Sequence, residues 1–203
     1  MKKRFLNYIK KAIKNQYPSY SNDKLDEIMY GVEGIYLTFT KTIIIFGIAI
    51  ILGIVKELIL LLLAFNFIRL FAFGIHADKS STCLIFSTSL FIGFAYLCKY
   101  AILNTNLLIT LYIIAFIFIC LFAPSDTVKR PLIRKDKRIR FKNLSIVVTI
   151  LFFITTLFIK NNLIVNSLIF GLLIECILIC PLTYKIFNMP YNNYKTYDLN
   201  TKK

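Results

Sequence analysis

Long apolar runs, interrupted at intervals by charged residues, are the dominant pattern along this chain. Six runs contain no Asp, Glu, Lys or Arg, at 42–55, 58–68, 80–98, 100–125, 143–159 and 161–174. Several approach or exceed the roughly 20 residues that a helix needs to cross a bilayer, and the shorter runs extend over flanking charged residues whose long side chains reach the interface. The runs lack the period-two alternation of membrane β-barrel strands, so we expect helices.

The pattern predicts an all-α, polytopic helical membrane protein with about six transmembrane helices. The expected spans are residues 36–55, 57–74, 83–98, 104–122, 143–159 and 163–181. We expect a single helical membrane domain over 1–203, organised as interfacial or cytoplasmic helices (1–35), spans one to four (36–122), a basic cytoplasmic loop (123–142), spans five and six (143–181) and a cytoplasmic tail (182–203). The composition agrees, because 58% of the residues are hydrophobic and only 17% are charged, unlike a soluble domain.

The N-terminal segment has an amphipathic pattern. Apolar side chains recur every four residues among lysines, at Phe5, Ile9, Ile13 and Tyr17. This spacing predicts a helix that lies on an anionic membrane surface and ends near Pro18. A second helix is expected to begin at Ser21 or Asn22, because acidic residues follow in its first turns, and to lead into the first span.

The distribution of positive charge predicts the orientation in the membrane. The chain has 25 Lys and Arg residues and a formal net charge of +15. If the N-terminus lies inside and the chain crosses the membrane six times, 21 of the 25 basic residues lie on the inner side. The four exceptions are Lys56, Lys99 and Lys160 on the outer side and Arg69 within the second span. The positive-inside rule therefore places both termini, the loop of His76 and the basic loop in the cytoplasm. The membrane accounts for the charge, so we expect no nucleic-acid partner.

The segment "RLFAFGIHADKSSTC" contains the single histidine, His76, and Cys83 seven residues later. A cysteine nucleophile needs a base, and an imidazole titrates close to cytoplasmic pH. On one unbroken helix the two residues would lie about 10.5 Å apart along the axis, too far for a hydrogen bond, so the segment has to turn. Gly74 and "DKSS" allow such a turn. These residues alone leave a Cys–His dyad and a coincidence of spacing both open.

Ionisable residues in or near the apolar runs are the other candidates, because charge is costly in lipid. Arg69 would bind a peptide carboxylate, pair with an internal acid or extend to the interface. We expect Glu175 to pair with another polar or charged side chain inside the protein, and Arg69 is the partner that we consider. Glu33 would orient the imidazole or be a solvated acid. Asp78 and Asp126 are alternative orienting groups, each better explained as a turn or cap residue.

The remaining cysteines show no pattern of chemistry. Cys98, Cys120, Cys176 and Cys180 are scattered through apolar runs with no CxxC pair. We therefore expect them to pack as small hydrophobic residues, with no disulfide framework, no metal site and no cofactor.

Several blocks of the sequence, in the same order, resemble the accessory gene regulator protein B (AgrB) family of bacterial membrane peptidases. These blocks are "YGVEGIYL", "IRLFAFGIHA" with Cys83 after it, "APSDTVKRPL" and "GLLIECILICP". The resemblance implies that Cys83 is the catalytic nucleophile and His76 its base. Arg69 and Gly74 match positions associated with activity, and Lys129 and Arg130 match the family's basic loop motif. Glu33 stands where some relatives have an amide, which leaves its role open.

The resemblance also implies an activity and partners. A cysteine endopeptidase would remove the C-terminal tail of an AgrD-like quorum-sensing precursor peptide and pass the acyl group to an internal Cys or Ser, which gives a thiolactone or lactone ring. Lys129, Arg130, Arg134 and Lys135 would attract an acidic tail, and the N-terminal helix would receive an amphipathic leader. The resemblance further implies a homodimer, in contact with membrane lipids, in the bacterial cell membrane.

Two other classes of function are compatible with the sequence. A non-enzymatic peptide exporter or insertion scaffold would use the basic loop only to bind acidic tails, and its activity would survive Cys83→Ala. A thiol–disulfide enzyme is disfavoured, because no resolving cysteine lies near Cys83.

Overall fold

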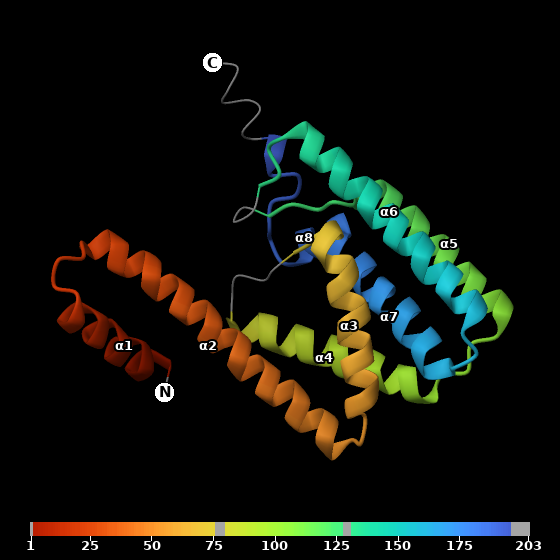
Figure 1. The fold of residues 1–203 in the computed structure, drawn as a ribbon, viewed down its shortest axis with the longest axis horizontal. Helices are drawn as coiled ribbons and strands as arrows, with labels where there is room; N and C mark the ends of the chain where they lie inside the picture. Colours follow the sequence, from red (N-terminus) through yellow and green to blue (C-terminus); the bar gives the residue numbers. More distant parts are fainter. Residues whose placement is uncertain (1, 76–79, 128–130, 196–203) are drawn as a thin grey trace. The chain divides into compact units, whose positions relative to one another are not determined.

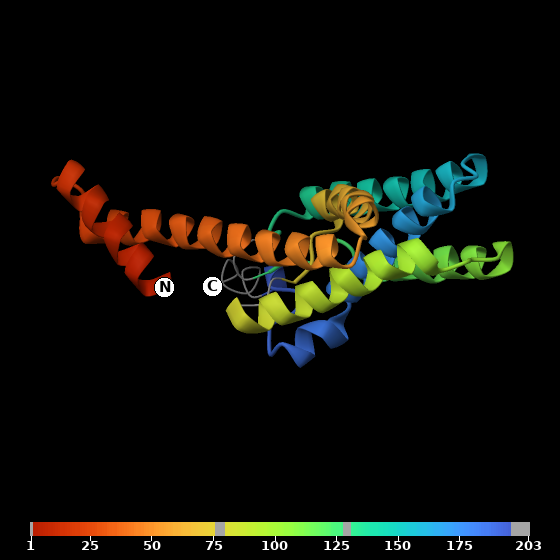
Figure 2. The same ribbon diagram turned by 90° about the horizontal axis from the view of Figure 1, so that it is seen from below.

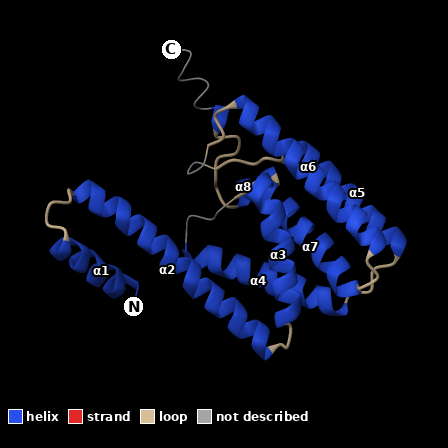
Figure 3. Ribbon diagram, in the orientation of Figure 1, coloured by secondary structure: helices blue, strands red, loops and turns tan. Residues whose placement is uncertain are grey.

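The computed structural model describes residues 2–75, 80–127 and 131–195. Within these ranges the regular structure is helical, and no strand is present (Figure 3). The helices are α1 (Lys2–Gln16), α2 (Asn22–Ile51), α3 (Val55–Ala72), α4 (Ser80–Tyr100), α5 (Thr105–Phe122), α6 (Lys135–Phe158), α7 (Asn162–Ile179) and α8 (Pro181–Ile186), as labelled in Figure 1. The predicted all-α class is confirmed.

Four of the described helices, α2, α5, α6 and α7, are long and apolar enough to cross a membrane. Helix α3 overlaps the predicted second span but carries Lys56, Glu57 and Arg69, and the apolar part of α4, Leu84–Tyr100, is shorter than these four. A helical membrane protein is thus confirmed, while the number of six spans stays a prediction.

The chain forms two compact units, Met1–Gly47 and Ile48–Lys203, and the boundary in the sequence falls within α2. In the first unit, α1 pairs with the beginning of α2: Lys10 Nζ lies 2.6 Å from Asp26 Oδ1, and the rings of Phe5 and Tyr36 lie 5.1 Å apart. The Ser21 hydroxyl accepts a hydrogen bond from a backbone N–H of the first turn of α2. The expected N-cap is therefore confirmed, and α2 continues without a break into the predicted first span.

In the second unit, α7 contacts α3, α4, α5 and α6 and lies at the centre (Figure 2). In the 18-residue apolar stretch of α7, 61% of the residues are buried, whereas 17% are buried in that of α5. The close approach of α3 and α7 depends on Gly171, because a Cβ there would lie 2.9 Å from the backbone nitrogen of Phe65. Since α7 has apolar residues on all sides, it can pack against several helices at once.

The predicted basic loop, 123–142, is shorter than expected because α6 begins at Lys135, not at residue 143. Its first two turns therefore contain most of the basic residues that we assigned to a loop. Lys and Arg are good helix formers, and their long side chains can extend away from the apolar surface, so the high density of charged residues does not prevent the helix from beginning at Lys135.

Candidate active site

The backbone that leads into His76 is held by hydrogen bonds to two other segments. Helix α3 ends at Ala72, and both Phe73 and Gly74 have positive φ, 62° and 99°. The N–H of Gly74 donates to Ser125 O at 2.8 Å, and the N–H of Ser125 donates to Ala72 O at 2.9 Å. The N–H of Ile75 donates to Leu178 O, in the last turn of α7, at 3.0 Å. Residues 73–75 are therefore fixed between the segment after α5 and the end of α7.

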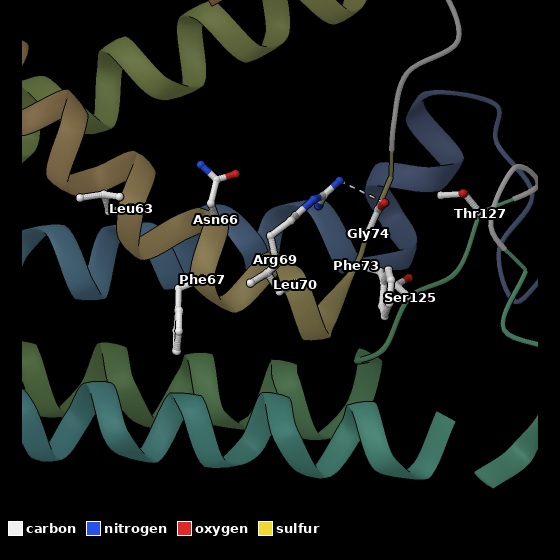
Figure 4. A pocket seen from close by; sticks show the side chains of 9 residues that line it. All are labelled: Leu63, Asn66, Phe67, Arg69, Leu70, Phe73, Gly74, Ser125 and Thr127. Atoms are coloured by element: carbon white, nitrogen blue, oxygen red, sulfur yellow. Dashed lines mark hydrogen bonds between the residues drawn. The ribbon is translucent and has the colours of Figure 1, made fainter. Parts of the chain in front are cut away.

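The guanidinium of Arg69 binds the same backbone from the side. Its Nη2 donates to Gly74 O at 3.1 Å and to Ile75 O at 2.8 Å, and Figure 4 shows the side chain reaching along α3 toward Gly74. Its Nη1 lies 3.2 Å from Oε2 of Glu175, whose side chain is fully buried. The pairing of Arg69 with Glu175, considered from the sequence, is confirmed. This arginine does not depend on the lipid interface for its partners.

Gly74 satisfies two separate requirements of this arrangement. A φ of 99° is strained for any residue with a side chain. A Cβ at this position would also lie 2.5 Å from Arg69 Nη1 and 3.1 Å from Leu178 O. The absence of a side chain is therefore what allows the guanidinium to cross the backbone here.

A pocket of about 510 Å³ adjoins this segment (Figure 4). Its walls are largely apolar, from Leu63, Phe67, Leu70 and Phe73, and its polar lining includes Arg69, Ser125 and Thr127. Because the nitrogens of Arg69 already serve three acceptors, the pocket suits an apolar group better than an anion.

The two proposed catalytic residues differ in how far the structure describes them. His76 lies outside the described residues, as do Asp78, Lys129 and Arg130. Cys83 belongs to the first turn of α4, but its side chain is not described. The predicted dyad therefore stays a prediction.

The other predicted site residues lie elsewhere. Glu33 is in α2 within the first unit, where it lines a pocket of about 350 Å³ together with Lys10, Asp26 and four other side chains. Arg134 directly precedes α6 and forms an exposed two-point pair with Asp136, at 2.7 and 3.3 Å, so its charge is partly balanced. Lys135 is the first residue of α6.

Asp126, which the sequence predicts to be a turn or cap residue, connects the segment after α5 to the C-terminal segment. Its side chain is buried and accepts hydrogen bonds from the backbone N–H groups of Asn193 and Tyr194, both at 2.9 Å, and from that of Leu132 at 3.3 Å. The Tyr184 hydroxyl donates to the backbone oxygen of Asp126 at 3.0 Å, and burial raises the pKa of Tyr184, which keeps this donor protonated. The only signal in the sequence is that Asp126 is one of just two acids in the basic segment 123–142.

Two of the scattered cysteines pack as expected. Cys98 and Cys176 are buried, and both lie against neighbouring helices or their ends, Cys98 near the Ser167 hydroxyl and Cys176 near the backbone oxygen of Ala115.

Comparison with known proteins identifies the family of this chain. Residues 2–179 match the family described as Accessory gene regulator B. An AgrB-like protein of Clostridium acetobutylicum is 32% identical over 93% of this chain and 90% of its own length, and one of Listeria innocua is 28% identical over 85% and 84%. Accessory gene regulator protein B of Staphylococcus saprophyticus is 30% identical over 80% and 87%. No solved structure matches the chain significantly. The chain belongs to the accessory gene regulator B family.

Proposed function

We propose that this chain is the membrane cysteine endopeptidase of an agr quorum-sensing system. It would cleave the C-terminal tail from an AgrD-like precursor peptide and close the remaining peptide into a thiolactone or lactone ring. Membership of the AgrB family supports a role in the agr system, and the apolar helices support a membrane location. The observation that carries the proposal is the anchored backbone of residues 73–75, directly before His76.

The local geometry is compatible with a Cys–His dyad. A dyad requires that His76 and Cys83 do not share one continuous helix, which would keep them too far apart. Helix α3 ends at Ala72 and Cys83 belongs to α4, so Cys83 does not lie on the helix that precedes the His76 segment. Cys83 lies in the first turn of α4, where the positive end of the helix dipole favours a thiolate. We propose that the His76 imidazole, which follows the anchored residues 73–75, takes the thiol proton.

The proposed reaction has two acyl transfers. The Cys83 thiolate attacks the carbonyl carbon of the scissile peptide bond, the C–N bond breaks, and the amine of the tail leaves with a proton from the His76 imidazolium. The thiol or hydroxyl of the precursor, deprotonated by His76, then attacks the thioester, and Cys83 leaves and recovers a proton. No water is consumed, so ring closure requires that the acyl-enzyme is kept from water and that the internal nucleophile is held close.

Basic residues of the segment 123–142 would attract the acidic tail of the precursor. Lys129, Arg130 and Lys135 are the main candidates, whereas the pair with Asp136 reduces what Arg134 offers. Charge reversal at Lys129 and Arg130 should slow processing, most strongly at low ionic strength. Lys160→Glu, a charge reversal in the connection between α6 and α7, is the control. Unchanged processing in the Lys129→Glu, Arg130→Glu variant would exclude this electrostatic role.

Further partners follow from the same proposal. The exposed side chains of Phe5 and Tyr8 on α1, among lysines, are suited to a lipid surface or to an amphipathic leader peptide.

We propose a homodimer as the working oligomeric state, which crosslinking in membranes would test.

The deciding experiment is coexpression of the full chain with the precursor gene encoded beside it, with the products measured by mass spectrometry. Wild type should give free tail, cyclic peptide and a precursor adduct on Cys83. His76→Ala and Cys83→Ala should give neither product, and Cys120→Ala, which also removes a free thiol, should behave as wild type. Unchanged processing by Cys83→Ala would instead favour the exporter or scaffold.

A further inference from the structure

We infer that Glu175 is a positioning residue for the proposed peptidase, which acts through Arg69 on the backbone that leads into His76. The inference rests on the proposed function and extends it to α7, which is separated from the His76 segment by about half of the chain.

Glu175 is bound to Arg69 by a single described contact. Its side chain has no exposed surface, and Oε2 lies 3.2 Å from Arg69 Nη1. The other oxygen, Oε1, has no hydrogen-bond partner among the described residues. A buried carboxylate needs a compensating charge, so the position of the Glu175 side chain is coupled to that of the guanidinium.

Arg69 transmits this constraint because its planar fork points in two directions. While Nη1 faces Glu175, Nη2 donates to Gly74 O and Ile75 O at 3.1 and 2.8 Å. A guanidinium is rigid, so fixing one nitrogen fixes the position of the other. The two carbonyl groups belong to the residues immediately before His76, and their orientation sets the direction in which the chain leaves toward the imidazole.

Helix packing alone does not explain the ion pair. Helices α3 and α7 already contact each other through apolar side chains and through the close approach at Gly171. A buried ion pair often adds little stability over apolar residues of similar size. An apolar pair could not supply the Arg69 N–H groups that donate to the carbonyl oxygens of Gly74 and Ile75. We therefore assign Glu175 to positioning.

The test is the kinetics of full-length protein in lipid nanodiscs acting on the precursor. Glu175→Met removes the charge and the acceptor at similar size, and it should lower kcat ~100-fold with little change in KM, the cost of a misplaced catalytic group. Glu175→Gln retains an acceptor oxygen and should lie between Glu175→Met and wild type, so it also serves if the methionine variant fails to fold.

The pH profile of Cys83 alkylation by iodoacetamide, resolved by peptide mass spectrometry, is the second measurement. In wild type a nearby imidazole should lower the apparent pKa of Cys83, and in Glu175→Met this pKa should return toward the value of about 8.5 for a free thiol. Asn166→Leu is the control, since Asn166 is a buried polar residue of the same helix that binds Cys98 O and Ala101 O instead. Folded Asn166→Leu protein should retain the wild-type alkylation profile and the wild-type kcat.

The outcomes separate this inference from the proposed function. Folded Glu175→Met or Glu175→Gln with wild-type kcat and an unchanged alkylation profile would overturn the positioning role. Cleavage that survives Cys83→Ala would reject the peptidase itself, whatever Glu175 does.

Discussion

Gly74 is the residue at which backbone conformation and side-chain chemistry depend most directly on each other. It combines a φ of 99° with the passage of the Arg69 guanidinium. We predict that Gly74→Ala displaces Arg69 from the carbonyls of Gly74 and Ile75 and lowers precursor cleavage ~100-fold, because a shift of about 1 Å can have this effect on catalysis. Cleavage assayed by mass spectrometry would measure the loss.

The control for this glycine is Gly93, in the middle of α4. A Cβ at Gly93 would meet nothing within 4 Å, so Gly93→Ala should keep full activity and leave stability unchanged or raised by roughly 0.5–1 kcal/mol. Equal losses in the two variants would show that the local geometry of Gly74 is not special.

Asp126 is predicted to hold the C-terminal segment in place. Asp126→Asn replaces an acceptor oxygen by an NH2 group that faces backbone N–H donors, which we expect to cost about 1–3 kcal/mol and to loosen residues 191–195. Limited proteolysis should then cut near Tyr194 faster than in wild type. Asp136→Asn, which loses only an exposed pair, should not change the cleavage rate; if it does, charge and not the tether explains the result.

Some of these residues could be predicted from the sequence and some could not. Arg69 and Glu175 stand out because a charge within an apolar run requires a partner, so polarity alone suggested their pairing. The sequence predicts a turn at Gly74. Its contact with Arg69 could not be predicted, because residues of α7 hold both Arg69, through Glu175, and the backbone next to Gly74, through Leu178 O. Two of the partners of Asp126, Asn193 and Tyr194, lie 67 and 68 residues away in the chain, and no local pattern indicates them.

At the scale of helices, the crossing of α3 and α7 determines the distance between Arg69 and Glu175. Gly171 lies at this crossing, where an added Cβ would come within 3.0 Å of the Ala64 Cβ. We predict that Gly171→Leu separates the helices, lowers stability by about 1–3 kcal/mol and reduces cleavage. Thermal unfolding in detergent and the cleavage assay measure the two effects, and wild-type behaviour in both would contradict a close crossing.

Hydrophobic periodicity predicted the helices well and their ends less well. The expected helix from Ser21 or Asn22 is present because capping and acidic residues are local signals. The apolar pattern predicts a span over 143–159 after a loop, whereas α6 begins at Lys135, because charged residues that extend a helix beyond the apolar region carry no hydropathy signal. The break between α7 and α8 at Cys180 precedes Pro181, which the sixth expected span had included.

At the scale of the whole molecule, the arrangement of basic residues predicts the topology. With six spans and an inside start, the α4–α5 connection lies outside and α8 lies inside. Three spans then separate Ile102 from Ile186, and both side chains are exposed, at 89% and 68%. Single cysteines at these two positions should therefore lie on opposite faces of the membrane.

Labelling of intact cells with a membrane-impermeant maleimide tests this topology. In a background with Cys98, Cys120, Cys176 and Cys180 replaced by Ala, Ile102→Cys should react at once and Ile186→Cys only after the membrane is permeabilised. The background protein alone is the control for reaction at Cys83. Labelling of both positions from one side would mean that an even number of helices crosses between them, so that α5, α6 and α7 do not all span. Because each of these three meets the length and hydropathy needed to cross, we expect opposite sides.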